Sequence, residues 1–217
     1  PYRDSNLAAG YKAAMTARTV DYIGVTDFAD YEPAGEPTAW LLAPIEAGSD
    51  RIGVLAVEFP ISKINRLMTV DGGWEDAGMG KTGETFLVGP DNLMRSNSRL
   101  FLQDPEAYQR RAVRAGTPPD VVDKAMRQHG TTLVQPVESE ATRSAAQGQT
   151  GDLIERNYLG HRALQSFAPV DLAGLRWTIV AQIDASEAFA PVAAFTRTLV
   201  LSTTGIVFVI CIAAMVL

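Results

Sequence analysis

The sequence predicts an α+β protein with two modules, each built on an antiparallel sheet, followed by a C-terminal transmembrane helix. Three observations support this fold class. Short runs of β-forming residues, bounded by tight turns, occur in two sets along the 217 residues. The two sets are related by an internal repeat. The last twenty residues contain no charged side chain, and a bilayer core needs about 20 apolar residues in a helix.

The first set of strands lies between two predicted helices. Residues 4–18 carry apolar side chains at helical spacing and start at Asp4 or Ser5, either of which can cap a helix. Residues 60–68 have the same periodicity. The strands between the helices are joined by turns rich in glycine, proline and acidic residues, and they span 19–28, 38–45 and 51–59. This order predicts an antiparallel meander.

The second set contains more helix. ETFLVG and LMRSNSR flank the turn PDN and predict a β-hairpin. Thr117 is expected to cap a helix that has prolines at its first positions. The expected elements are, in order, strands at 84–89 and 93–99, helices at 105–116 and 118–129, a helix or loop at 138–150, and strands at 151–159, 162–170 and 175–183.

An internal repeat connects the two sets. LLAPI at 41–45 corresponds to SFAPV at 166–170, and RIGVLAVEF at 51–59 corresponds to RWTIVAQID at 176–184. Both correspondences have an offset of 125 residues, without a gap. Two unrelated hairpins can look alike over so short a stretch, but the constant offset favours duplication. The chain would then contain the second half of one module and the whole of another.

The residues after the last strand predict a helix that enters a membrane. Asp184 with Glu187 three positions later is close to a capping box, and the helix can continue from Ala185 through Arg197. Pro191 is expected to kink it. A buried helix of a soluble protein usually keeps a polar stripe, whereas TLVLSTTGIVFVICIAAMVL has none. We therefore expect a piece of a longer membrane protein, with its charged side chains on one side of the bilayer.

Composition argues against several classes of function. The net charge is −6 and no basic stripe is present, so we expect no nucleic-acid partner. Cys211 is the single cysteine, which rules out an intrachain disulfide. His129 and His161 lie far apart without partner cysteines. No metal ion and no cofactor are predicted.

The tripeptide Gly80-Lys81-Thr82 suggests a phosphate-binding loop. That motif needs a glycine five positions earlier, where this chain has Glu75. It also needs a helix N-terminus after the loop to supply amides, whereas a strand is predicted after Thr82. A glycine-rich turn that leads into a strand is the better interpretation.

Two stretches resemble the double Cache sensor domains of bacterial transmembrane receptors. GKTGETFLVGPDNLMRSNSR at 80–99 is similar to that family's hairpin motif TGETYLVG…MRSDSR, with Asn97 where an aspartate is common. WTIVAQIDASEAFAPV at 177–192 is similar to its last strand and exit helix, and VLAVEFPISKINRLM at 54–68 to the end of its membrane-distal module. The resemblance implies two PAS-like (Cache) modules outside the cytoplasmic membrane.

The resemblance also implies a domain division. Residues 1–68 would be the C-terminal half of a membrane-distal module with flanking helices, so that the first module is incomplete. Residues 69–184 would be a membrane-proximal module, and 185–217 the exit helix and transmembrane segment. The hairpin motif looks most like that of receptors with an adenylate/guanylate cyclase output. Chemoreceptors and histidine kinases carry similar sensors.

Two groups of side chains are candidates for ligand binding. In the distal module, aromatic side chains could enclose a small ligand and a carboxylate could pair with an amine: Tyr22, Asp27, Tyr31 and Trp40. In the proximal module, alternate positions of the predicted strand would form one polar row for an anion: Arg95, Asn97 and Arg99. Both groups have a structural alternative, as core aromatics in the first case and as partners of nearby carboxylates in the second.

These features predict an extracytoplasmic ligand sensor that acts through its transmembrane helix on a cytoplasmic output domain. The expected partners are a small molecule, the membrane and a second copy of the chain, with residues 1 to about 197 outside the cell membrane. One alternative is a membrane-anchored enzyme, although no GxSxG motif or metal-ligand set is present. A ligand-free interaction or dimerisation module is the other.

Overall fold

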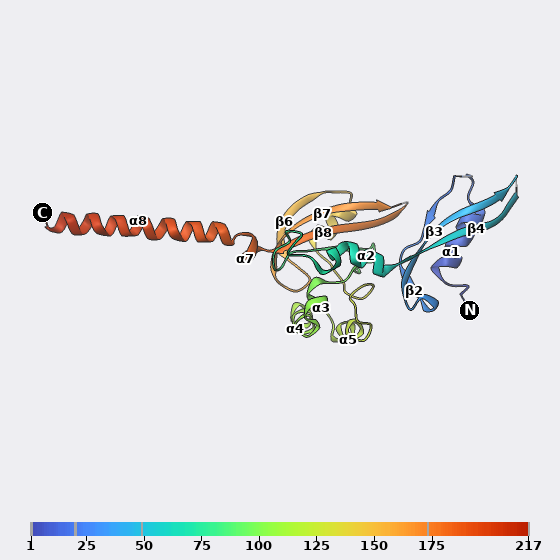
Figure 1. Ribbon diagram of the computed structural model, residues 1–217, viewed down its shortest axis with the longest axis horizontal. Helices are drawn as coiled ribbons and strands as arrows, with labels where there is room; N and C mark the ends of the chain where they lie inside the picture. Colours follow the sequence, from blue (N-terminus) through green and yellow to red (C-terminus); the bar gives the residue numbers. More distant parts are fainter. Residues whose placement is uncertain (1, 20, 49, 173, 217) are drawn as a thin grey trace.

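The computed structural model describes residues 2–19, 21–48, 50–172 and 174–216. Two four-stranded antiparallel sheets follow one another along the long axis, and helix α8 (Ala190–Val216) projects from the second one (Figure 1). The predicted α+β class with two antiparallel sheets is therefore confirmed. The sheet nearer the N-terminus is called the distal sheet below, and the sheet that leads into α8 the proximal sheet; each sheet with the helices that pack on it is called the distal or the proximal module.

Strand β3 is the centre of the distal sheet and pairs antiparallel with three other strands. Helix α1 packs on β3 and β4. Ser5 caps α1 by accepting a hydrogen bond from the Ala8 amide, as predicted. The elements are α1 (Asn6–Thr16), β1 (Gly24–Val25), β2 (Ala29–Tyr31), the short 3-10 helix η1 (Glu32–Ala34), β3 (Glu36–Ala47) and β4 (Asp50–Pro60).

The strand predicted over 19–28 is mostly absent, and Val20 lies outside the described residues. Only β1 forms there, and β2 appears where a turn was expected. The strand is interrupted because the Thr26 and Asp27 side chains accept hydrogen bonds from backbone amides that a neighbouring strand would otherwise pair with. Thr26 Oγ1 accepts a hydrogen bond from the Trp40 amide at 3.0 Å, and Asp27 Oδ1 accepts one from the next amide at 2.7 Å.

The proximal sheet has the strand order β5-β8-β7-β6, and every neighbouring pair is antiparallel. Helix α6 packs on β6, β7 and β8. Helix α2 (Ile61–Met68) joins the modules, followed by the 3-10 turn η2 (Val70–Gly72). The remaining elements are β5 (Glu84–Val88), α3 (Arg99–Gln103), α4 (Pro105–Ala115), α5 (Pro119–Arg127), α6 (Glu140–Ala146), β6 (Gly151–Arg156), β7 (Arg162–Leu172) and β8 (Leu175–Asp184).

The strand predicted over 93–99 does not form, so the predicted polar row along it does not exist. Only isolated bridges remain, at Leu93 and Met94. Ser96 Oγ accepts a hydrogen bond from the Leu87 amide at 3.1 Å, and Ser98 caps helix α3 through its side chain. Arg99 is therefore the first residue of a helix, because serine oxygens take the place of a β-ladder partner.

The two long hairpins preserve the repeat where each of them turns. Glu46 pairs with Arg51, and 125 residues later Asp171 pairs with Arg176. Further from the turn the registers differ by one residue, because β3 and β4 have a bulge next to Ile45. The hairpins thus agree in pairing at the turn, which includes Arg51 and Arg176, but not along the aligned strand stretches 41–45 and 166–170.

The connection from β8 to the long C-terminal helix has a break, where the sequence predicted one helix from Ala185 through Arg197 with a kink at Pro191. Helix α7 (Ala185–Ala188) has Phe189 as its C-cap, and α8 (Ala190–Val216) begins one residue before Pro191, where the kink was expected. Pro191 lies in the first turn of α8, where its missing N–H has no cost. Asp184 makes no side-chain cap, so the predicted capping box is also wrong.

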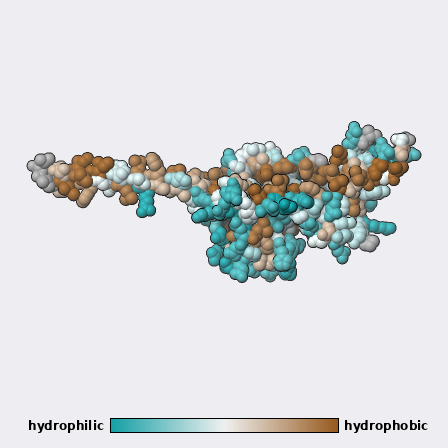
Figure 2. Space-filling view, viewed as in Figure 1, coloured by the Kyte–Doolittle hydropathy of each residue, from teal (hydrophilic) through white to brown (hydrophobic). Residues whose placement is uncertain are grey.

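Among the described residues, α8 is the one helix long and apolar enough to cross a membrane. Its 27 residues correspond to about 40 Å, more than the roughly 30 Å of a hydrocarbon core. No residue of its apolar window is buried against the rest of the chain. Figure 2 shows its hydrophobic surface in brown along the projecting rod.

Candidate functional site

The two modules are joined by a buried ion pair. Arg95, in the loop after β5, donates from Nε and Nη2 to the two carboxylate oxygens of Asp27 at 3.0 and 2.9 Å. Arg95 Nη2 also lies 2.9 Å from Asp91 Oδ2. The Arg95 side chain is only 3% exposed, so the planar guanidinium is held by two carboxylates away from solvent.

Trp177 on β8 completes this junction. Its Nε1 donates to Asp27 Oδ1 at 3.2 Å, and its ring stacks on Phe28 with centroids 5.7 Å apart. Gly89 packs directly on the Arg95 guanidinium, so that a Cβ at this position would collide with it. The junction therefore joins the β1–β2 loop of the distal module to the β5 loop and β8 of the proximal module. Asp27, predicted as an amine ligand, is occupied by Arg95.

Electrostatics favour the charged forms at the junction. Burial alone would lower the pKa of Arg95, but the hydrogen bonds to Asp27 and Asp91 outweigh it and raise the pKa. Burial alone would raise the pKa of Asp91, but the hydrogen bonds from Arg95 and from the Leu93 amide, together with the charge of Arg95, outweigh it and lower the pKa. The guanidinium thus stays charged at any physiological pH.

The other two members of the predicted row have separate partners. Asn97 Oδ1 accepts hydrogen bonds from the amides of Thr131 and Thr132, and the Asn97 amide donates to Asn65 on α2. Arg99 Nη1 donates to the carbonyls of Gly80 and Gly83 at 3.0 and 2.5 Å. These contacts hold loops of the chain together, but their partners are backbone groups and amides rather than the carboxylates of the structural alternative.

Three of the four distal candidates do meet. Tyr31 and Trp40 pack edge to face with centroids 5.2 Å apart, and Tyr22 packs against the same cluster. Tyr31 and Asn97 also line one open cavity of about 490 Å³ between the modules. Asp27 belongs neither to this aromatic cluster nor to the lining of this cavity, because its carboxylate faces Arg95.

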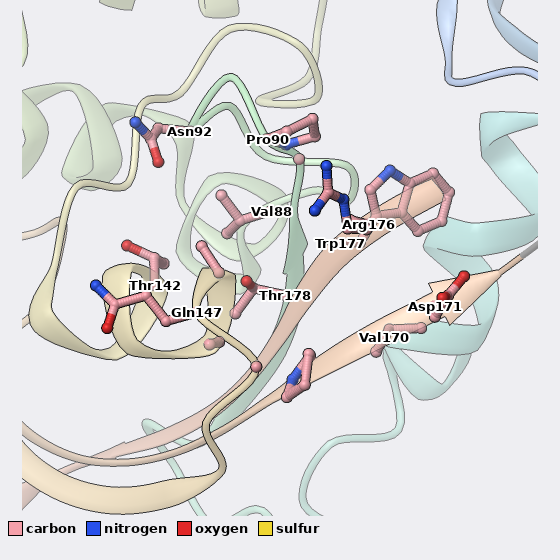
Figure 3. Close-up of a pocket in the computed structure, with 15 residues that line it drawn as sticks. Val88, Pro90, Asn92, Thr142, Gln147, Val170, Asp171, Arg176, Trp177 and Thr178 are labelled. Atoms are coloured by element: carbon pink, nitrogen blue, oxygen red, sulfur yellow. The ribbon is translucent and has the colours of Figure 1, made fainter. Parts of the chain in front are cut away.

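A different cavity of about 660 Å³ opens in the proximal module between the sheet and the C-terminal end of α6. Figure 3 shows its polar side chains arriving from three directions. Asp171, Arg176 and Thr178 come from neighbouring strands, Thr142 and Gln147 from the α6 region, and Asn92 from the turn after β5. Val88, Pro169 and Trp177 add apolar surface.

The cavity has charges of both signs. Asp171 and Arg176 are directly paired positions of β7 and β8, and both are exposed. Within the described part of the chain, no hydrogen bond or ion pair involves the Arg176 side chain. A free guanidinium fork suits a carboxylate or another oxyanion, and the carboxylate opposite suits a donor or cation.

Sequence reasoning did not identify this cavity. Its polar residues come from segments more than 80 positions apart, between Asn92 and Thr178. The available signals were the repeat, which aligns Arg176 with Arg51, and Asn92, a turn residue that adopts a positive φ of 61°. Neither indicates a cavity without the fold.

The glycine-rich loop before β5 binds an anion after all, although an internal one. The amides of Lys81 and Thr82 donate to the two carboxylate oxygens of Glu187 at 2.7 and 2.8 Å, and Thr82 Oγ1 adds a bond at 2.6 Å. The hydrogen bond from the Thr82 hydroxyl contributes most to lowering the pKa of Glu187, and the bonds from the two amides add to it. The amides that a phosphate loop would offer to a nucleotide hold α7 here.

Comparisons with known proteins define the class of fold. No protein-family model matches the sequence, and no curated protein is significantly similar to it. The extracellular domain of a candidate histidine kinase, mmHK1S-Z3, superposes with a TM-score of 0.50 at 15% identity, over 89% of this chain and 58% of that one. The chain therefore shares the fold of that extracellular domain and spans less than two thirds of its length.

Weaker matches include chemoreceptor ligand-binding domains. The domain of PctB from Pseudomonas aeruginosa PAO1, in complex with L-Arg, has a TM-score of 0.49 at 18% identity over 87% of this chain and 62% of that one. The domain of CtaA from Pseudomonas fluorescens, in complex with L-alanine, has a TM-score of 0.49 at 15% identity over 86% and 63%. None of these matches supports the predicted cyclase output.

Proposed function

We propose that the chain is the extracytoplasmic sensor region of a transmembrane signalling receptor, with two Cache modules divided at residues 68 and 184. A small molecule bound in the cavity of Figure 3 would change the position of β8 and thereby of α8. One observation supports this most directly. Arg176, Trp177 and Thr178 line the cavity from β8, and β8 leads into α7 without an intervening loop.

The link from β8 to the membrane is held by side chains from outside the helix. Asp184 Oδ2 lies 2.9 Å from His161 Nδ1, and its amide donates to Thr82 Oγ1 at 3.1 Å. Glu187 is bound by the loop before β5. A shift of β8 would be passed to α7 by these contacts, provided that the ligand binds two arrangements with different affinity.

The chemistry of the cavity favours a ligand with an anionic group for Arg176 and a donor or cationic group for Asp171. The cytoplasmic output domain would be a histidine kinase or a chemoreceptor signalling domain, which the fold comparison favours. A nucleotide cyclase is the alternative output domain. The sensor would work as a homodimer with residues 1 to about 197 outside the membrane. No enzymatic step is assigned to this part of the protein.

The test is a thermal-shift screen of the chain in nanodiscs against amino acids, dicarboxylates and amines. We expect one of these classes to raise the Tm of the unaltered chain and to lose this effect in Arg176→Ala. Arg162→Ala is the matched control, since Arg162 is an exposed arginine of β7 outside the cavity. A Tm increase that persists unchanged in Arg176→Ala would contradict the proposed site.

Coupling has its own readout in the same samples. Cys211, the only cysteine, lies in α8 and can carry a spin label. The ligand should change the label's mobility or the label–label distance in a dimer. Four glycines inserted after Ala188 should abolish this change while leaving the Tm increase intact. A change that survives the insertion would disprove coupling through β8 and α7.

A further inference from the structure

Two arginines of the proximal module are buried, and their charges are balanced in different ways. Arg95 is 3% exposed and is held by the carboxylates of Asp27 and Asp91. Arg99 is 4% exposed, and within the described residues no carboxylate lies at ion-pair distance from its guanidinium. Burial lowers the pKa of Arg99, whereas the pKa of Arg95 is raised. Because an unpaired buried charge is costly, an anion from outside the chain would stabilise Arg99.

The guanidinium of Arg99 is fixed by neutral partners and keeps one nitrogen free. Nη1 donates to two backbone carbonyls of the glycine-rich loop at 3.0 and 2.5 Å, and Nε donates to Gln103 Oε1 at 3.2 Å. The carboxylates of Glu75 and Glu187 act on it only at longer range. Nη2 has no hydrogen-bond partner among the described residues, yet it is not one of the fully enclosed atoms, so a small molecule can reach it.

Arg99 lines a cavity of about 200 Å³ beside the end of β8, together with other free donors. Lys81, from the loop before β5, and Arg111, from α4, are exposed, and their side chains bond no other described residue. Asn157, in the turn between β6 and β7, accepts hydrogen bonds at Oδ1 from the amides two and four positions later, which leaves Nδ2 free. Donors thus reach this cavity from four separate segments.

The acceptors of the same lining are mostly used inside the protein. Glu84 accepts three hydrogen bonds, including one of 2.8 Å from the Arg99 amide. Burial raises the pKa of Glu84, which reduces the negative charge that it presents. Asp184 Oδ2 lies 2.9 Å from His161 Nδ1. An excess of free donors, three of them cationic, indicates a ligand that accepts hydrogen bonds and carries negative charge.

We propose that this cavity binds a compact oxyanion, inorganic phosphate or the phosphate group of a lipid, with Lys81, Arg99 and Arg111 as its cationic ligands. A water takes up about 30 Å³, so the cavity holds a phosphate and a few waters but not a nucleotide. Phosphate offers four oxygens to donors that come from four segments, whereas a carboxylate offers two. The cavity shares no lining residue with that of Figure 3, so this site goes beyond the proposed function.

The oxyanion site adjoins the start of the C-terminal helices. The loop that carries Lys81 also holds Glu187 of α7 through its amides, and its Gly80 carbonyl accepts from Arg99. An oxyanion shared by Lys81, Arg99 and Arg111 would fasten this loop to α3 and α4. Binding would thereby restrain α7 independently of the Arg176 site.

The experiment uses the whole chain in dodecyl maltoside, a detergent without phosphate. Sodium phosphate replaces sodium chloride at constant ionic strength and pH, and the Tm and the heat of binding are followed. We expect a saturable rise in Tm, because an anion that binds only the folded chain stabilises it by mass action. A Tm that does not respond to phosphate beyond the chloride reference overturns the proposal.

A matched pair of variants locates the binding. Arg111→Gln removes an exposed cation of the lining that bonds nothing else, so it should keep the Tm measured without phosphate and weaken phosphate binding at least about tenfold. Arg114→Gln removes the same charge from an exposed position of α4 outside the cavity and should leave binding unchanged. Equal affinities of the two variants overturn the site. Phosphate binding should also be unchanged in Arg176→Ala, whether or not the proposed sensor site is correct.

The two sources of the phosphate group are distinguished by repeating the titration in phosphatidylglycerol nanodiscs. Phosphate affinity equal to that in dodecyl maltoside identifies a free anion as the ligand. Affinity that is weaker in these nanodiscs for the unaltered chain and for Arg114→Gln alike identifies a lipid headgroup that already fills the site.

Discussion

The two long hairpins have the same register at their turns and use the same arginine in different ways. Arg51 in the distal hairpin is fully engaged: it bonds Glu46 at 3.2 Å and the carbonyls of Ala14 and Met15 at 3.1 and 3.0 Å. It thus closes the C-terminal end of α1. Its counterpart Arg176 lines an open cavity. The arginine at equivalent positions of the repeat therefore has a structural role as Arg51 and is available to a ligand as Arg176.

The two sheets differ also in how their faces are covered. In the proximal sheet, Phe86 and Val180 on one face are 1% exposed and Trp177 on the other is 4% exposed, because α6 and α2 pack on opposite sides. In the distal sheet, α1 covers Trp40 and Leu42. The opposite face is open: Leu41, Leu55 and Val57 are between 43% and 55% exposed. Figure 2 shows brown surface along this sheet.

The difference in burial implies that the proximal sheet is more stable than the distal sheet. Apolar burial contributes about 25 cal/mol per Å², so a sheet with one covered face gains far less than one with two. The distal sheet compensates by sharing a core with its neighbour. Phe28, Ile61, Leu87 and Trp177 belong to one buried cluster that spans the junction. The distal module should therefore depend on the proximal one for its order.

The largest effect should come from truncating the same residue type in each module. Phe86→Ala removes a ring that is 1% exposed from the core under α6 and should cost about 3–5 kcal/mol of unfolding free energy. Phe59→Ala, at 39% exposed on the open face of β4, should cost about 1 kcal/mol or less. Urea unfolding followed by tryptophan fluorescence measures both. Equal losses would mean that the open face of β4 is covered in the folded protein.

The second effect tests the junction between the modules. Arg95→Met leaves Asp27 and Asp91 without their cation, and removing one member of a buried pair costs about 3–5 kcal/mol, less here because Asp27 is 28% exposed. We expect about 2–3 kcal/mol, together with faster proteolysis of the distal module at unchanged proximal protection. Asp27→Asn is the companion variant. If the two losses simply add in the double variant, the pair is not coupled.

Arg95→Met should also change how the unfolding free energy depends on pH. Arg95 lowers the pKa of Asp91, so the ionised carboxylate stabilises the fold. This contribution is fully present above the unfolded value of 3.8 and is lost as the pH falls through the lower folded pKa. Arg95→Met should remove this part of the acid sensitivity. An acid-unfolding midpoint that does not respond would show that Asp91 contributes nothing.

The sequence predicted the elements whose signals are local. The absence of charge after Arg197 predicted the long apolar helix α8, and runs of β-forming residues bounded by turn residues predicted β3, β4, β7 and β8. The strand expected at 93–99 failed because serine side chains compete with the ladder, and such competition depends on which amides come near.

The site was less predictable, because its contacts connect distant positions. Asp27 and Arg95 were both predicted as ligand residues, but separately, and the structure pairs them over 68 positions. A carboxylate and a guanidinium in a sequence do not reveal whether each faces a ligand or the other. The cavity of Figure 3 was missed for the same reason. Only the packing of α6 against the sheet creates it.

The smallest effect returns to the two arginines of the repeat. Arg51→Ala should cost about 1–2 kcal/mol, because charge-assisted bonds to the end of α1 and to Glu46 are lost from a side chain that is 17% exposed. Arg176→Ala should change the unfolding free energy by less than about 0.5 kcal/mol, since its exposed side chain makes no described bond. Thermal unfolding of both variants without ligand measures the difference. A free guanidinium retained at no cost to the fold is what a binding position requires, so a large loss in Arg176→Ala would reassign it to the structural role of Arg51.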